Sequence, residues 1–167
     1  MQTKICAAGG LFVVALLAGC NAGAQPVNVG QQFPGFEGED LLTGKKIALK
    51  QFRGKVVLID FWATWCGPCV GEIPNIKRAY DKYHKQGFEI ISISLDHNKD
   101  DCERFVKREK MNWHHIFDGG SRLAARYGVR GIPAMYLVGK DGRVVSDNAR
   151  GRRLEPAIKE ALRKLAK

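Results

Sequence analysis

The stretch FWATWCGPCVGEIP, residues 61–74, decides how the rest of the sequence is interpreted. It holds two cysteines, Cys66 and Cys69, separated by Gly67 and Pro68. Cysteines at this spacing serve as a structural disulfide, as half of a metal site, or as a pair that is oxidised and reduced during a reaction. The surrounding residues must decide among these three uses.

The two cysteines are predicted to lie where a strand gives way to a helix. Residues 55–62, KVVLIDFW, are almost continuously apolar, which predicts a strand buried on both faces of a sheet. After Cys69, apolar residues recur three or four positions apart, which predicts a helix that is kinked at Pro74 and ends near Gly87. These apolar residues are Ile73, Ile76, Tyr80 and Tyr83. The N-terminus of such a helix stabilises a thiolate at Cys66 through its partial positive charge and free N–H groups.

This position favours a redox pair over the two other uses. A disulfide that closes so short a loop gains little from chain entropy, so it makes a weak structural staple. A zinc site needs further ligands, and the spacing of His114 and His115 from the cysteines matches no zinc pattern with two Cys and two His. Cys66 is therefore predicted to attack disulfides as a thiolate, and Cys69, one turn into the helix, to resolve the mixed disulfide. We expect no metal and no cofactor.

The remaining pattern is that of an α/β domain. Further strands are predicted over 88–95, 134–139 and 143–148, and further helices over 99–110, 121–128 and 154–165. Lys140, Asp141 and Gly142 form a hairpin signal between the last two strands, and residues 33–55 predict a small hairpin or loop before the first strand. Helices between central strands, followed by a final hairpin, predict a mixed sheet covered on both faces.

The composition fits one globular domain with a basic surface. Of 167 residues, 45% are hydrophobic and 26% are charged, and the net charge is +10. The positive residues are spread along the chain without a block of five or six, and no nucleic-acid motif accompanies them. We therefore expect a solvated basic surface, a monomer, and no binding of nucleic acid.

The N-terminal residues predict export from the cytoplasm. Lys4 is followed by a short apolar run at 11–18, too short to cross a bilayer as a mature helix. The ending Leu-Ala-Gly-Cys at Cys20 resembles a bacterial lipoprotein box, which implies cleavage before Cys20 and attachment of lipid to it. A secretory signal that merely contains a cysteine is the alternative. The expected divisions are a signal peptide over 1–19, a flexible tether over 20–30, and a folded extracytoplasmic domain over 31–167.

Two motifs together resemble the thioredoxin fold. DFWATWCGPC is similar to the active-site stretch of thioredoxin-fold proteins, and Gly131-Ile132-Pro133 before a strand is similar to their cis-proline loop. Four finer features resemble the TlpA/ResA-type branch of membrane-anchored thiol–disulfide oxidoreductases. They are the lipoprotein leader, the extension over 33–54, a long stretch over 96–132 with an inserted helix and the strand-like NWHHIF, and Glu72. The resemblance implies a thioredoxin fold with an N-terminal extension and a central helix and strand insertion.

The resemblance also assigns acids to the site. Asp60, six residues before Cys66 in an apolar strand, matches the buried acid that exchanges a proton with the second cysteine in thioredoxins. A solvent-facing acid at the strand end is the alternative. Ser92 stands where thioredoxins place a lysine near that acid, which leaves the charge of Asp60 open. Glu72 is assigned the same proton-handling role from the helix, or else it simply favours the helix dipole.

Three further residues are expected to contact substrate. Trp65 is interpreted as an exposed platform, with ordinary packing as the alternative. The resemblance implies that Pro133 is cis and that the backbone of Ile132 pairs with a substrate strand.

The resemblance implies that the chain reduces disulfides of extracytoplasmic proteins. Relatives of this branch often act on apocytochrome c and receive electrons from a membrane thiol carrier, and Gly67-Pro68 is the dipeptide of reducing thioredoxins. An oxidase or isomerase is the nearest alternative. A peroxiredoxin-type peroxidase lacks its Pro-x-x-x-Thr-x-x-Cys arrangement here, and a copper chaperone of this fold uses a wider spacing of its cysteines.

Overall fold

The computed structural model describes residues 26–164. The predicted signal peptide, the lipid site at Cys20 and the first part of the predicted tether lie outside the described residues. Within the described part, no helix is long and apolar enough to cross a membrane.

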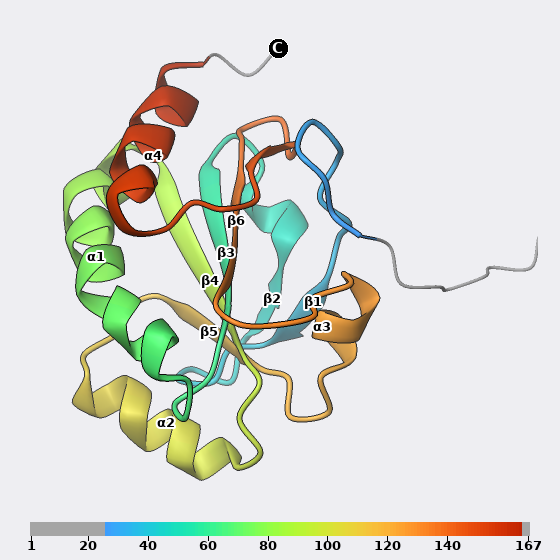
Figure 1. Cartoon of the computed structure of the whole chain (residues 1–167), viewed down its shortest axis with the longest axis vertical. Helices are drawn as coiled ribbons and strands as arrows, with labels where there is room; N and C mark the ends of the chain where they lie inside the picture. The colour runs from blue at the N-terminus through green and yellow to red at the C-terminus, as the bar shows by residue number, and fades with distance from the viewer. Residues whose placement is uncertain (1–25, 165–167) are drawn as a thin grey trace, which may run out of the picture.

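A mixed sheet of five strands forms the centre of the domain, in the order β5-β4-β3-β6-β7 (Figure 1). β3 (Val56–Trp62) lies in the middle, parallel to β4 (Phe88–Ser94), which is parallel to β5 (His114–Phe117). On its other side β3 pairs antiparallel with β6 (Ala134–Val138), and β6 pairs antiparallel with β7 (Val144–Ser146). The predicted mixed sheet and its final hairpin are confirmed.

Three helices cover the face of the sheet on which the cysteines lie. α1 (Gly67–Tyr83) packs beside α4 (Leu154–Arg163), and α2 (Lys99–Arg108) adds Cys102 and Val106 to the same apolar cluster (Figure 1). β3 contributes to this cluster the alternate side chains of Val56, Leu58 and Trp62. Burial of these side chains is the main driving force that holds the helices on the sheet.

A hairpin and a short helix cover the opposite face. β1 (Glu37–Glu39) and β2 (Lys46–Ala48) form the small hairpin expected before the first core strand, and α3 (Arg122–Arg126) lies on the same side (Figure 1). β3 contributes to this second cluster the other alternate side chains, Val57, Ile59 and Phe61. Because both faces of β3 are buried, its sequence is almost continuously apolar.

The predicted insertion between the second strand and the cis-proline loop is present. α2 begins after Asn98, whose side chain accepts hydrogen bonds from the N–H groups of Asp100 and Asp101 at 2.9 and 3.1 Å. The strand-like NWHHIF contains β5, which extends the sheet beyond β4.

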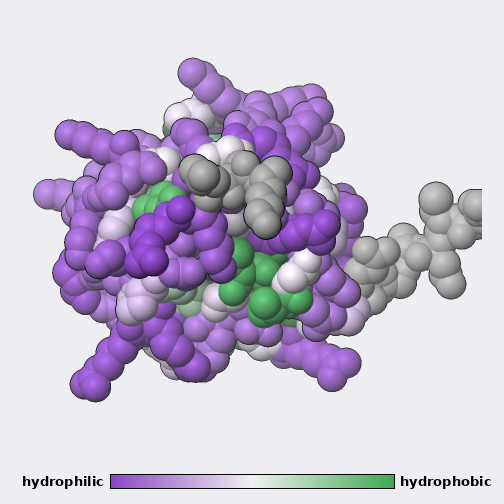
Figure 2. Space-filling view, turned by 90° about the horizontal axis from the view of Figure 1, so that it is seen from above, coloured by the Kyte–Doolittle hydropathy of each residue, from purple (hydrophilic) through white to green (hydrophobic). Residues whose placement is uncertain are grey.

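The surface of the domain is largely polar. Figure 2 shows one end of the molecule, where hydrophilic residues cover most of the surface and hydrophobic residues appear in small areas. Among the large hydrophobic side chains of the described part, Val29 and Trp65 are the exposed ones. Isolated exposed apolar residues are ordinary on a surface, but Trp65 stands beside the cysteines.

Candidate active site

Cys66 and Cys69 form a disulfide at the start of α1, with an S–S distance of 2.09 Å. Cys66 is the N-cap residue of the helix, and its sulfur accepts a hydrogen bond from the backbone N–H of Cys69 at 3.3 Å. Pro68 fits the first turn, where a helix needs no N–H donor, and the helix continues without interruption through Pro74. Both cysteines are buried in the disulfide form, Cys66 at 6% and Cys69 at 3% exposure.

Asp60 is a buried carboxyl on the cysteine face of β3. Its side chain shares the face of Leu58 and Trp62, and its exposure is 3%, so the solvent-facing alternative is wrong. It stands opposite Ser92 of β4, whose hydroxyl donates to Oδ2 at 3.3 Å. Burial raises the pKa of Asp60 from 3.8 to about 7, against the lowering effect of the Ser92 hydrogen bond and with a further raising effect from the charge of Glu72. Asp60 can therefore take up or release a proton near neutral pH.

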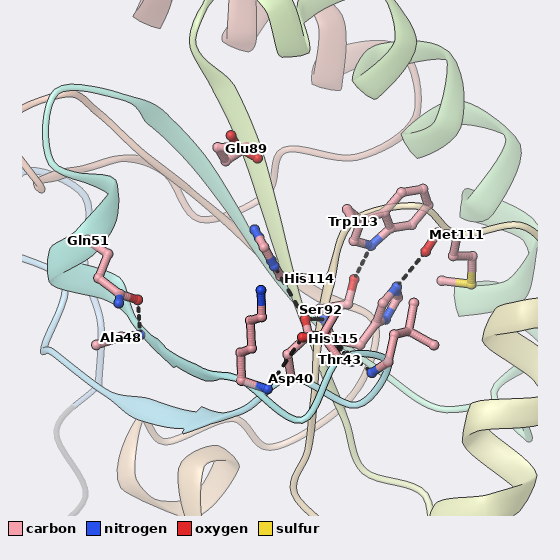
Figure 3. A network of polar contacts seen from close by, with 12 residues as sticks. Asp40, Thr43, Ala48, Gln51, Glu89, Ser92, Met111, Trp113, His114 and His115 are labelled. Carbon is pink, nitrogen blue, oxygen red and sulfur yellow. Dashed lines mark hydrogen bonds and ion pairs between the residues drawn. The ribbon is translucent and has the colours of Figure 1, made fainter.

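A buried polar chain continues from Asp60 toward the edge of the sheet, and Figure 3 shows its part from Ser92 onward. The indole Nε1 of Trp113 donates to the Ser92 hydroxyl at 2.9 Å, and the Trp113 ring stacks on His115 at a centroid distance of 5.5 Å. The Nε2 of His115 donates to the carbonyl oxygen of Met111 at 3.1 Å. Burial lowers the pKa of His115 to about 4, so its ring is neutral beside this chain at neutral pH.

This chain was missed by the sequence analysis, which gave Trp113 and His115 no role. The available signal was their spacing in NWHHIF, because residues two positions apart in an extended segment lie on the same face.

Glu72 binds a loop rather than remaining free at the helix surface. Its Oε2 accepts the backbone N–H of Gly151 at 2.9 Å and the side-chain amide of Asn75 at 3.2 Å. The residue therefore joins α1 to the segment that leads into α4. Its charge also acts on Asp60, as the raised pKa of that residue shows.

The residues expected to meet substrate surround the disulfide. Trp65 is 60% exposed and stacks on His97 with an interplanar angle of 10°, so ordinary packing in the core does not describe it. The Ile132–Pro133 peptide bond is cis, as expected. Pro133 and Pro68 line one hollow in the surface, which places the cis-proline loop beside the cysteine motif.

A second buried carboxylate, Asp96, fixes the loop that precedes the cysteines. It accepts hydrogen bonds from the backbone N–H of Thr64 at 3.0 Å, from the Thr64 hydroxyl at 2.6 Å and from the Ser94 hydroxyl at 2.7 Å. The sequence gave no signal for this contact, because Asp96 and Thr64 are 32 positions apart. Cys102 is fully buried nearby, and burial raises the pKa of its thiol to about 12.

A zinc site at the two cysteines would need further ligands, and the part of the chain that the structure describes holds no such set. No three His, Cys, Asp or Glu side chains gather there in a way that could hold a metal ion.

Comparison with known proteins places this site in a family. The family model described as "AhpC/TSA family" matches residues 29–146. A thiol-disulfide oxidoreductase ResA of Bacillus thuringiensis subsp. konkukian (strain 97-27) is 36% identical over 141 residues, 84% of this chain and 80% of the relative. The chain belongs to the AhpC/TSA family, as a ResA-type thiol–disulfide oxidoreductase.

Another ResA-type relative and two solved structures support the same family and fold. The ResA of Bacillus subtilis (strain 168) is 32% identical and matches 84% of this chain and 76% of its own length. The thioredoxin domain of a thiol-disulfide oxidoreductase from Bacteroides vulgatus superposes with a TM-score of 0.75 at 28% identity, covering 80% of this chain and 97% of that one. A putative thiol:disulfide interchange protein DsbE from Chlorobium tepidum has a TM-score of 0.75 at 29% identity, covering 81% and 99%. The predicted thioredoxin fold and disulfide oxidoreductase activity are confirmed.

Proposed function

We propose that this ResA-type oxidoreductase works as a reductant, passing electrons from the Cys66 and Cys69 dithiol to disulfides of extracytoplasmic proteins. Reduced Cys66 attacks the substrate disulfide and forms a mixed disulfide, and one substrate thiolate leaves. Cys69 then attacks Cys66, closes the disulfide seen here, and releases the second substrate thiolate, so that two electrons pass to the substrate. Asp60 accepts the proton of the Cys69 thiol during this second step.

The environment of Asp60 is the observation that supports a reductant rather than an oxidant. A dedicated reductant needs a dithiol form that is less stable than its disulfide. Within residues 26–164, the hydrogen bond recorded for Asp60 comes from the neutral Ser92, and no ion pair offsets a negative charge on Asp60. A buried carboxylate on the cysteine face disfavours a second negative charge at Cys69, and Glu72 adds to this effect. Both acids therefore favour the disulfide form and support a low reduction potential.

The N-cap position of Cys66 acts in the opposite direction. The helix N-terminus stabilises a Cys66 thiolate, and stabilisation of the reduced form makes a strong oxidant. An oxidase or isomerase is therefore the alternative function, and the reduction potential separates it from the reductant.

The deciding experiment is an equilibrium titration of the purified chain against a thiol buffer, with the Cys66 and Cys69 pair followed by mass after thiol alkylation. A value near or below about −250 mV supports the reductant, and a value above about −180 mV assigns the chain to oxidation or isomerisation. Stoichiometric copper binding by the reduced chain, without a reversible two-electron couple, would instead favour a copper chaperone.

The proposed setting is the outer side of the cytoplasmic membrane or the periplasm. Lipid on Cys20 would hold the chain, as a monomer, near a membrane thiol carrier that reduces it again, and apocytochrome c is one proposed substrate. The support is the leader sequence and the ResA family. Mass spectrometry of the protein from its native membrane tests the anchor, because a Cys20→Ser chain should lack the added acyl mass.

A further inference from the structure

A hollow of about 380 Å³ beside the disulfide has a basic rim. Pro68, which lies between the two cysteines, and the cis residue Pro133 line it together with Glu72 and the segment 150–153. That segment reads Arg-Gly-Arg-Arg, and its three arginines are exposed. The hollow therefore brings three positive side chains to the place where the reacting part of a substrate has to lie.

The arginine segment is held in place at both ends. Ala149, just before it, is fully buried and its N–H donates to the carbonyl of Met135 in β6 at 3.4 Å. Leu154, just after it, is buried at 1% exposure as the first residue of α4. Between these two anchors the Gly151 N–H donates to Glu72 at 2.9 Å, so α1 fixes the middle of the segment.

The three arginine side chains remain available to a ligand. Within residues 26–164, neither Arg150 nor Arg152 nor Arg153 forms an ion pair with an acidic side chain. Glu72, the carboxylate that lines the same hollow, has its Oε2 on Gly151 and Asn75. Guanidinium groups recognise carboxylates through paired N–H donors, and three of them along one rim favour an acidic partner.

We propose that Arg150, Arg152 and Arg153 form a recognition rim for acidic side chains near the reacting cysteine of a substrate polypeptide, with Glu72 as the positioning residue. The inference rests on the proposed function in one respect, that the partner is a polypeptide disulfide or dithiol. It does not depend on the direction of electron transfer. A polypeptide is favoured over a lipid surface because the rim shares its hollow with Pro133 and with Pro68, which lies between the two reacting cysteines.

The test measures second-order rate constants of exchange between the chain and disulfide-bridged peptides. Three peptides share one sequence and carry glutamates, serines or lysines on either side of their cysteines. At low salt we expect the acidic peptide to react roughly tenfold faster than the neutral one, and the basic peptide to react more slowly. High salt should remove most of this preference, because the rim is exposed. Equal rates for all three peptides, both as disulfides with the reduced chain and as dithiols with the oxidised chain, overturn the proposal.

The variant Arg150→Gln/Arg152→Gln/Arg153→Gln should reduce the acidic preference to less than about twofold. The matched control is Lys45→Gln/Lys46→Gln/Lys50→Gln, which removes the same charge from exposed residues at and after the β1–β2 hairpin. The control should keep the preference. If it loses as much preference as the rim variant, net charge rather than the rim attracts the peptides, and the proposal is wrong.

Glu72 variants test the positioning role. Glu72→Ala should lower the ratio of acidic to neutral rates by severalfold, while Glu72→Gln should restore the ratio, because its amide oxygen can still accept the Gly151 N–H. A proton-handling role would change both rates equally and leave their ratio alone, which would overturn the positioning role.

One further measurement keeps this inference separate from the proposed reductant function, and a second separates a polypeptide from a lipid surface. The peptides are also offered as dithiols to the oxidised chain. An acidic preference in their oxidation, with no measurable reduction of the disulfide peptides by the reduced chain, supports the rim while the reductant proposal fails. Vesicles of phosphatidylglycerol are the second probe. If the chain binds these vesicles through the three arginines and shows no preference among the peptides, the rim recognises a lipid surface, and the proposal of a polypeptide partner is wrong.

Discussion

Replacement of Asp60 by asparagine should stabilise the disulfide form of the protein above neutral pH. Asparagine has the shape of the carboxyl group, and its oxygen can still accept the Ser92 hydroxyl. Unlike aspartate, it never has to carry a buried charge, and Asp60 is only 3% exposed.

The size of the effect follows from the pKa of Asp60. In the unfolded chain Asp60 titrates near its ordinary value of 3.8, and burial raises its pKa to about 7 in the folded state. Between these two values the folded state binds one proton more than the unfolded state, so stability falls as pH rises. At about 1.4 kcal/mol per pH unit, the interval corresponds to about 4 kcal/mol. Well below pH 4 the side chain is neutral in both states, and the folded state loses no stability through Asp60. Above pH 7 the side chain is charged in both states, and the full loss of stability is present.

The measurement is guanidinium unfolding of the oxidised wild type and of Asp60→Asn from pH 4 to 9. Titration of the groups that do not interact with Asp60 cancels in the difference between the two proteins. We expect a difference of less than about 1 kcal/mol at pH 4 that grows to about 4 kcal/mol at pH 8 in favour of the variant. The infrared band of a protonated carboxyl group should also disappear from the wild type as pH passes about 7. A difference that stays constant with pH would refute the buried, proton-exchanging Asp60.

The other predictions concern the thiols and the hydrogen bond to Asp60. Cys69→Ser should lose at least 100-fold in turnover of a disulfide substrate yet accumulate a mixed disulfide visible by mass spectrometry, while Cys66→Ser should form none. Ser92→Ala should raise the pKa of Asp60 further, because a bond to the carboxylate is lost, and should destabilise the chain by about 1–3 kcal/mol, which denaturant unfolding will show. Cys102 should stay unmodified by a thiol reagent at pH 8 in the native protein and react on unfolding, because burial raises its pKa to about 12.

The fold could be predicted from sequence because its elements carry local signals. The apolar run of β3, the helical spacing after Cys69 and the hairpin turn at Gly142, which has a φ of +82°, each depend on residues close together in the chain. The redox pair could be predicted for the same reason, since a strand end, two cysteines and a helix start follow one another. Asp60 was identifiable because a charged residue inside an apolar run needs an explanation.

The contacts that shape the site could not be predicted in this way. Glu72 was expected to handle protons or to favour the helix dipole, and its contact with Gly151 spans 79 positions of sequence. No residue near Trp113 in the sequence indicates that its indole donates a hydrogen bond to Ser92. The pairing of β4 with β5 brings the two residues together. Such contacts are decided by strand register and by the packing of α4 on α1, which no local pattern contains.

The number of hydrogen-bond donors separates the two buried carboxyls near the cysteines. Asp96 accepts from the Thr64 N–H, the Thr64 hydroxyl and the Ser94 hydroxyl, so its oxygens are held by donors that fix the loop before Cys66. Among the described residues Asp60 accepts one hydrogen bond, from Ser92 at 3.3 Å, and in that environment burial outweighs the bond and raises its pKa to about 7. A buried carboxyl with one neutral donor is disfavoured in its charged form, so it gains much from a proton. The same residue type therefore positions the nucleophile at one place and exchanges protons at the other.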